Sequence, residues 1–177
     1  AEIAQRNGTG LILETATWRA SPDWGKRLGY TTESLAEVNR KAVALLEAIR
    51  KEYGSDRTPV VISGCVGPRG DGYVVGGAMT PAEAAAYHGL QARAFADAGA
   101  RMISAITMTY VEEAIGVTRA ANAVSLPVVI SFTVETDGRL PSGETLGEAI
   151  EATDAGCAVA PAYYMVNCAH PTHFDAV

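Results

Sequence analysis

Short apolar segments alternate with longer segments of helical periodicity along the chain, and this order limits the possible folds more than any other feature. The apolar segments span residues 10–16, 59–63, 102–106, 127–134 and 158–166. Most of them lack an alternation of polar and apolar side chains, which is typical of strands buried on both faces of a parallel sheet. Strands and helices in this strict order predict right-handed βαβ units and an α/β fold with an all-parallel sheet.

The segments between the expected strands carry recognisable helix boundaries. In residues 32–53, apolar side chains recur at three- and four-residue steps, and Gly54 stands where the helix should end. Capping-box sequences, in which a threonine precedes a glutamate by three residues, begin at Thr80, Thr109 and Thr145. In this motif the two side chains accept hydrogen bonds from otherwise unpaired N–H groups of the first turn. We therefore expect helices to begin at these three positions.

Two architectures are compatible with this order: a doubly wound sheet and a (β/α)8 barrel. A doubly wound nucleotide-binding sheet should carry a glycine fingerprint directly after an early strand. The nearest candidate, Gly70-x-Gly72, has Val75 in place of the third glycine and lies in a long loop, so we reject it. A barrel unit takes ~30 residues, so 177 residues supply about five or six units. The residues thus predict either an open sheet or a piece of a longer barrel.

Composition and charge exclude several classes of function. The net charge is −6, with 14 Lys and Arg residues against 20 Asp and Glu residues, which argues against the clustered basic residues of nucleic-acid-binding proteins. The longest nearly uncharged apolar run, residues 156–166, is interrupted by Pro161 and is shorter than the ~18 residues of a membrane-spanning helix. The N-terminus shows no signal pattern, and the three cysteines fit free thiols in a reducing compartment. We therefore expect a cytoplasmic protein without nucleic-acid or membrane partners.

The residues that follow the expected strands are the candidates for chemistry, because barrel proteins build their sites at the C-terminal ends of the strands. The most reactive group is Cys168, flanked by Asn167 and followed by His170 and His173. Sulfur and imidazole ligands suit zinc, although Pro171 separates the histidines and opposes a regular helical arrangement. The spacing is equally compatible with Cys168 as a small buried side chain.

The remaining histidine and cysteines have simpler interpretations. Cys157 precedes the last expected strand among small apolar residues, which favours a packing role, and Cys65 is expected to be a loop thiol without a function. His88 shares a helix stripe with Ala92 and Phe95, which favours a histidine in the core or on the helix surface. No lysine follows an expected strand, which excludes a Schiff-base mechanism.

The stretches VETDGRLPSGETL and VNCAHP resemble specific motifs of the homocysteine S-methyltransferase family. The resemblance runs in family order from about residue 10 to residue 174, and it includes LETATWRASPDWGKRLGY, SGCVGPRGDGY, MTPAEAAAYHGLQARAFADAGA and AITMTYVEEAIG. Family members are (β/α)8 barrels. The resemblance implies that the five expected strands are the second to sixth strands of such a barrel, without the first unit and the last two. The expected fold class is therefore an α/β partial (β/α)8 TIM barrel, with residues 1–177 as a single partial barrel domain.

The resemblance also implies a chemistry. Family members hold zinc through three cysteines, one that follows an Asn at the end of the sixth strand and two in a later Gly-Gly-Cys-Cys motif. Cys168 matches the first zinc ligand and Asn167 its orienting neighbour, whereas the Gly-Gly-Cys-Cys motif is absent from this sequence. Zinc would bind the substrate as a thiolate, the form that attacks a methyl group. The side chains expected to line the substrate pocket are Glu14, Thr17, Trp18, Thr107 and Asn167.

One position departs from the family pattern. Many members carry a Glu-Thr pair at the end of the fourth strand, where the Glu is taken to hold the amino group of the substrate, and here the pair is Ile106-Thr107. Either Glu14 or Glu135 binds the amino group instead, or the substrate is a thiol other than homocysteine. No residue selects the methyl donor among S-methylmethionine, S-adenosylmethionine, betaine and a methylated corrinoid.

Two functional hypotheses follow. In the first, the chain belongs to a zinc-dependent enzyme that transfers a methyl group from a small-molecule donor to the thiol of homocysteine, or of a related compound, while the isolated chain binds zinc weakly and is inactive. In the second, it is a truncated, inactive barrel that acts at most as a binding or interaction module. We also expect self-association, because the first and last strands would be apolar edges without partners.

Overall fold

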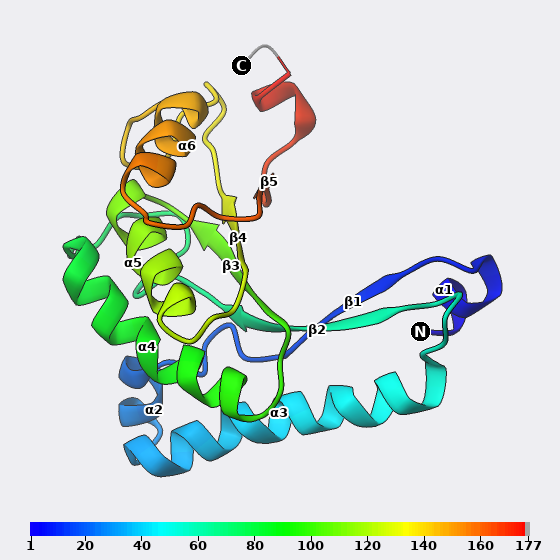
Figure 1. Ribbon diagram of the computed structural model, residues 1–177. Helices are drawn as coiled ribbons and strands as arrows, with labels where there is room; N and C mark the ends of the chain where they lie inside the picture. Colours follow the sequence, from blue (N-terminus) through cyan, green and yellow to red (C-terminus); the bar gives the residue numbers. More distant parts are fainter. Residues whose placement is uncertain (176–177) are drawn as a thin grey trace.

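The computed structural model describes residues 1–175, and its strands form one open, curled sheet (Figure 1). The strands are β1 (Leu11–Glu14), β2 (Val60–Val66), β3 (Met102–Met108), β4 (Val128–Phe132) and β5 (Tyr163–Val166). They are parallel, and each pairs with the strand that follows it in the sequence. This order excludes the doubly wound alternative, in which the strand order reverses at a switch point. The chain therefore forms part of a (β/α)8 barrel.

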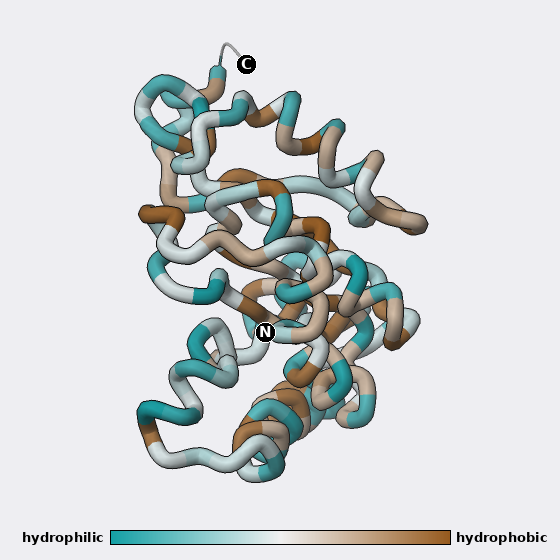
Figure 2. The backbone as a smooth tube through the Cα atoms, turned by 90° about the vertical axis from the view of Figure 1, so that its left-hand side faces the viewer, coloured by the Kyte–Doolittle hydropathy of each residue, from teal (hydrophilic) through white to brown (hydrophobic). Residues whose placement is uncertain are grey.

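The longer helices lie on the convex side of the sheet and connect its strands (Figure 1). Hydrophilic and hydrophobic residues alternate within the turns of these helices (Figure 2), because one face of each helix packs against the sheet and the other is exposed to solvent. No helix within residues 1–175 is long and apolar enough to cross a membrane. The helices are α1 (Glu2–Asn7), α2 (Pro22–Arg27), α3 (Thr32–Tyr53), α4 (Pro81–Asp97), α5 (Val111–Asn122), α6 (Leu146–Ala155) and the 3-10 helix η1 (Pro171–His173).

Two of the three expected capping boxes are present. At the starts of α4 and α6, the side chains of Thr80 and Thr145 each accept a hydrogen bond from the backbone amide of the glutamate three residues later. The carboxylate of that glutamate accepts a hydrogen bond from the threonine amide in return. The prediction at Thr109 was wrong, because Tyr110 precedes α5 and makes no side-chain cap hydrogen bond. The reason is the length of β3, which continues to Met108 and delays the turn into the helix.

The strands β2 and β3 are longer than the apolar runs suggested, whereas β1, β4 and β5 are shorter. β2 continues to Val66, so the expectation of a loop position for Cys65 was wrong: this thiol lies within β2 and is buried. β5 is confined to Tyr163–Val166. The preceding residues include Pro161, which has no N–H to donate to a neighbouring strand.

Each of the three central strands carries a fully buried serine on the inner face of the sheet, and this face differs from the outer one. The hydroxyls of Ser63 and Ser104 hydrogen-bond to each other at 2.7 Å, and Ser131 occupies the corresponding part of β4. Neighbours along the strands, such as Ile62 and Ile130, point the other way and pack into the core beneath the helices. The inner face of the sheet thus combines small hydroxyls with apolar side chains such as Ile106 and Met165, whereas the outer face is apolar.

The crossing of α4 and α5 provides a test of the packing on the outer face. A Cβ atom on Gly116 of α5 would lie 2.3 Å from the Cβ of Ala84 in α4. Gly116→Ala should lower the free energy of unfolding by about 1–3 kcal/mol, because the two helices must move apart. Gly147 in α6 has no heavy atom near its Cβ position, so Gly147→Ala should leave this free energy unchanged or raise it by up to ~1 kcal/mol. Denaturant unfolding measures both variants, and equal stabilities would contradict the close packing.

The edges of the sheet provide a second test. β1 and β5 each have a strand on one side only among the described residues, and Ile12 and Tyr163 on these strands are 46% and 42% exposed. Unpaired edges with apolar side chains favour pairing with another chain. We expect the isolated 177-residue chain to self-associate in sedimentation velocity experiments. A monodisperse monomer that melts cooperatively would contradict this expectation.

Candidate functional site

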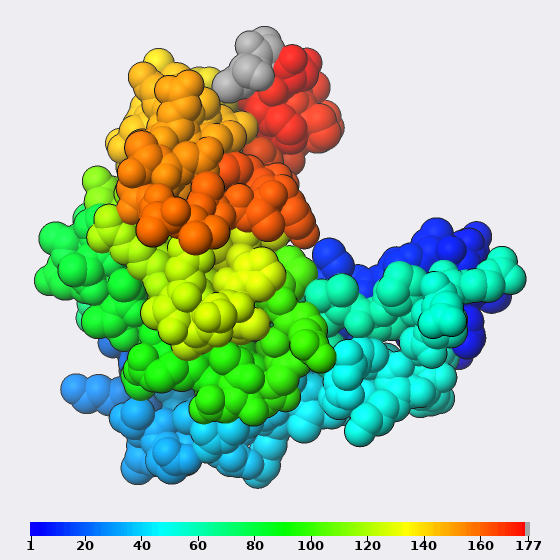
Figure 3. Space-filling model, viewed as in Figure 1, coloured from blue at the N-terminus to red at the C-terminus, as the bar shows by residue number. Residues whose placement is uncertain are grey.

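The concave side of the sheet forms a hollow between β1 and β5, which is visible in the space-filling view (Figure 3). A pocket of about 420 Å³ lies there and is lined by residues of β1, β3, β4 and β5, including Glu14, Ile106, Ser131 and Asn167. Glu14 is the only charged residue in the lining of this pocket. Two of the expected substrate-binding residues, Glu14 and Asn167, therefore share one cavity with the position at which the family glutamate is replaced.

β3 ends in a bulge that prepares one wall of the site. The register with β4 shifts between Ile106 and Met108, which leaves Thr107 without a partner in the ladder. Thr107 has φ = 67°, a left-handed conformation that is unusual for a β-branched residue. Its free amide donates a hydrogen bond to Asn167 Oδ1 at 3.0 Å, and Asn167 Nδ2 donates to Thr107 Oγ1 at 2.8 Å. The Asn167 side chain thus stabilises the bulge through two hydrogen bonds.

The Asn167 amide also connects two further groups. Its Oδ1 accepts a hydrogen bond from the Ser131 hydroxyl at 2.7 Å, and its Nδ2 donates to the Cys168 sulfur at 3.1 Å. One side chain therefore links the ends of β3, β4 and β5. This arrangement fixes the position of the Cys168 thiol relative to the pocket.

Cys168 is exposed, and the nearby histidines do not join it in a metal site. His170 Nδ1 lies 2.9 Å from the Thr172 hydroxyl, and the His170 and His173 rings are 6.2 Å apart between centroids. Within residues 1–175, no three His, Cys, Asp or Glu side chains are grouped closely enough to hold a metal ion. Zinc sites take at least three protein ligands. The described donor set, with Cys168 as its one matching sulfur ligand, does not by itself fit a zinc ion.

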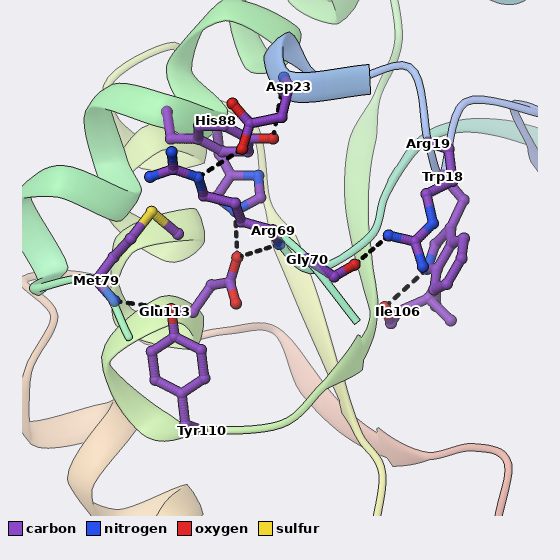
Figure 4. A network of polar contacts seen from close by, with 11 residues as sticks. Trp18, Arg19, Asp23, Arg69, Gly70, Met79, His88, Ile106, Tyr110 and Glu113 are labelled. Atoms are coloured by element: carbon purple, nitrogen blue, oxygen red, sulfur yellow. Dashed lines mark hydrogen bonds and ion pairs between the residues drawn. The ribbon is translucent and has the colours of Figure 1, made fainter. Parts of the chain in front are cut away.

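Thr17 and Trp18 lie outside the 420 Å³ pocket and connect β1 to its neighbours. The Thr17 hydroxyl donates to the Cys65 carbonyl at 2.7 Å and contacts the Thr15 hydroxyl, which accepts from the Cys65 amide at 2.9 Å. Trp18 Nε1 donates to the Ile106 carbonyl at 3.0 Å (Figure 4). These contacts support the site from one side, and direct contact with substrate stays a prediction for both residues.

The other acidic candidate for the amino group, Glu135, lies in a different hollow. It lines a groove of about 430 Å³ together with Tyr73, Asp137 and Arg139. Interaction with the Cys168 thiol raises the pKa of Tyr73. No sequence pattern singles out Tyr73, because this residue lies in a long loop far from Cys168 along the chain.

A second polar cluster, formed by His88 and Glu113, contacts the loop that contains Tyr73. His88 was expected either in the core or on the helix surface, and its exposure of 1% places it in the core. Its Nε2 lies 2.9 Å from Glu113 Oε1 (Figure 4). The sequence patterns did not identify Glu113, because the capping-box spacing from Thr109 falls on its exposed neighbour Glu112. The available signal was an acidic residue on the apolar face of a predicted helix.

The three thiols should differ in reactivity. Burial raises the pKa of the Cys65 thiol to about 12, with a further contribution from the Glu14 carboxylate, and burial also raises the pKa of Cys157. With a pKa of about 12, roughly one Cys65 side chain in ten thousand is a thiolate at pH 8. We expect iodoacetamide at pH 8 to alkylate the exposed Cys168 at least about tenfold faster than Cys65.

Peptide mass spectrometry over a time course measures these alkylation rates. The denatured chain is the control, because unfolding removes the differences in burial and should bring the three rates together. Labelling of Cys65 as fast as Cys168 in the folded chain would contradict the structure.

Comparison with known proteins places this geometry in a family. The family model described as homocysteine S-methyltransferase matches residues 6–177. A search of curated protein sequences returned no match. Similar solved structures include the homocysteine methyltransferase MmuM from Escherichia coli in its metallated form, with a TM-score of 0.81 and 20% identity over 94% of this chain and 60% of that chain.

Two further structures of MmuM give the same result. The oxidized form has a TM-score of 0.83 and 19% identity over 97% of this chain and 62% of that chain. The apo form has a TM-score of 0.74 and 21% identity over 97% of this chain and 61% of that chain. At these identities the likeness establishes the fold, and the chain spans about three fifths of the length of MmuM. Because the family model covers nearly the whole sequence, the chain belongs to the homocysteine S-methyltransferase family.

Proposed function

We propose that this chain provides the homocysteine-binding part of an enzyme that transfers a methyl group from a small-molecule donor to the homocysteine thiol, giving methionine. The observation that carries this proposal is the arrangement around Asn167. Its amide joins the ends of three strands, holds the Cys168 sulfur and lines a pocket that contains one carboxylate. Family membership supports the reaction class.

Glu14 is the group that we propose for the amino group of the substrate. The pocket of about 420 Å³ is large enough for an amino acid, and Glu14 is its only charged lining residue. Ile106 lines the same pocket, so an ammonium group there can be reached by Glu14 although the family glutamate is absent. Glu135 is less suitable, because it belongs to the neighbouring groove.

Cys168 is the residue that we propose as a metal ligand, with Asn167 as the group that orients it. A hydrogen bond donated to a ligand atom from the outer shell fixes its direction and tunes the bound metal. The described residues supply one such sulfur, so we derive no reaction step from a metal ion. Residues 1–177 are proposed as a single partial barrel domain, and activity would require the barrel units and ligands that family members contain in addition.

The open edges of the sheet favour a second candidate function. β1 and β5 pair on one side only in the described part of the chain, and the metal donor set is incomplete. A catalytically inactive barrel that binds small thiols or other chains would have these properties. The coding sequence after Val177 distinguishes the two: a Gly-Gly-Cys-Cys motif about two βα units downstream favours the enzyme, and an immediate stop codon favours the binding module.

Kinetics of a protein that contains this sequence within a complete barrel test the proposal. Cys168→Ser should lower methyl transfer to homocysteine by about 100-fold or more, since loss of a ligand exceeds the effect of its outer-shell partners. Cys157→Ser is the matched control, because this half-buried thiol packs against the core away from the pocket. Equal activity of the Cys168→Ser and Cys157→Ser variants would refute the role of Cys168.

The same assay tests the carboxylate. Glu14→Gln should raise KM for homocysteine about tenfold or more, because it removes a charged partner of the ammonium group. Glu135→Gln should leave KM unchanged. The reverse pattern would place the amino group in the groove beside Tyr73.

A further inference from the structure

The connection between β2 and α4, residues 67–79, lies directly on Trp18 and Thr107, two residues that support the proposed site. Gly67 and Gly72 provide the closest approaches. A Cβ on Gly67 would lie 2.6 Å from Trp18 Nε1, and a Cβ on Gly72 would lie 3.1 Å from Thr107 Cγ2. The amide of Gly67 also donates to the Trp18 carbonyl at 3.1 Å. The Gly67–Gly72 segment therefore covers Trp18 and the bulge at Thr107 without space for a side chain.

Two buried groups at the start of α5 hold this connection at both ends (Figure 4). Near its beginning, the Arg69 amide donates to Glu113 Oε1 at 2.7 Å. At its end, the Met79 amide donates to the Tyr110 hydroxyl at 3.1 Å. Glu113 is fully buried, and its second contact, His88, is buried as well. Helix α5 thus fixes where the connection leaves β2 and where it enters α4.

The exposed contacts of the connection are weaker by comparison. The Arg69 guanidinium bonds Asp23 at 2.8 Å and stacks over Tyr87, and Arg19 donates to the Gly70 carbonyl. Exposed ion pairs contribute little because water screens them. A buried carboxylate is different, since its removal leaves the Arg69 amide and the His88 ring nitrogen without a partner inside the protein. Glu113 is therefore the contact that determines the position of the segment.

We propose that Glu113 is a positioning residue for the substrate site: through the Arg69 amide it holds Gly67–Gly72 against Trp18 and Thr107. Trp18 then keeps its bond to the Ile106 carbonyl, and Thr107 keeps its two bonds to Asn167, which orients Cys168. The inference rests on the proposed function only because that proposal makes this region a substrate site. The effect of Glu113 on the position of Trp18 can be measured without substrate.

The test uses Trp18 as a reporter in the full 177-residue chain. The sequence contains two tryptophans, so a Trp24→Phe background makes Trp18 the only one. In this background, Glu113→Ala should red-shift the Trp18 emission and increase its quenching by acrylamide. The Arg69 amide should exchange with solvent about tenfold faster or more, as expected for loss of a hydrogen bond to a charged group. Glu113→Gln retains an accepting oxygen and should restore both signals in large part.

Two further variants separate positioning from general destabilisation. Glu112→Ala removes an exposed carboxylate from the same turn of α5 and should change neither signal. Gly67→Ala displaces the segment from Trp18 without touching the buried cluster, so it should shift the emission in the same direction as Glu113→Ala. The shift in the double variant should be smaller than the sum of the two single shifts. If Glu113→Ala fails to fold, Glu113→Asp takes its place in this comparison, because the side chain shorter by one methylene withdraws the acceptor from the Arg69 amide.

The outcomes decide the inference. Faster exchange at Arg69 with unchanged Trp18 emission would overturn it, because the segment would then be released without effect on the site. Additive shifts in the double variant would overturn it as well. Homocysteine titrations of the same variants distinguish failure of this inference from failure of the proposed function. If Glu113→Ala shifts the Trp18 emission but the chain does not bind homocysteine, the result supports the positioning role and counts against the proposed function.

Discussion

Parallel pairing of strands that are neighbours in the sequence governs the rest of this structure. It places the carboxyl ends of β1 to β5 at one edge of the sheet in chain order. Residues as distant in sequence as Glu14 and Asn167 therefore line one pocket. The same pairing sets small serines beside apolar side chains such as Ile106 and Met165 on the inner face, so the curl of the sheet encloses a hollow of mixed character that contains the Glu14 carboxylate.

Polar side chains after β5 and in α5 convert this scaffold into a defined site. Asn167 satisfies the amide that the bulge releases at Thr107, and Glu113 satisfies the amide of Arg69 in the connection above it. An unpaired N–H in such surroundings would be costly, so each acceptor selects one backbone path. One acceptor bonds the bulge at Thr107 and the other bonds the loop that packs on this bulge, which explains how a loop and a bulge can hold a fixed geometry.

Two incomplete features have one explanation within the proposed function. In the described part of the chain, the sheet has free edges at β1 and β5, and Cys168 is the one sulfur that we propose as a metal ligand. In the barrel that family resemblance implies, the units beyond those represented here would cover the edges and supply the other cysteines. The similarity to MmuM, of which this chain spans about three fifths, agrees with that arrangement.

The sequence by itself determined the order of the strands and of the longer helices, both ends of α3 and the starts of α4 and α6. Through family motifs it also predicted the Asn167-Cys168 pair as part of the site. These features depend on residues within a few positions of each other, as in the cap at Thr80. Only the tertiary structure decided which polar groups are buried and paired. Thr107 and Asn167 are 60 residues apart, and Arg69 and Glu113 are 44 apart. A bulge or a buried carboxylate is stable only when such a distant partner satisfies it, and no local pattern records that partner.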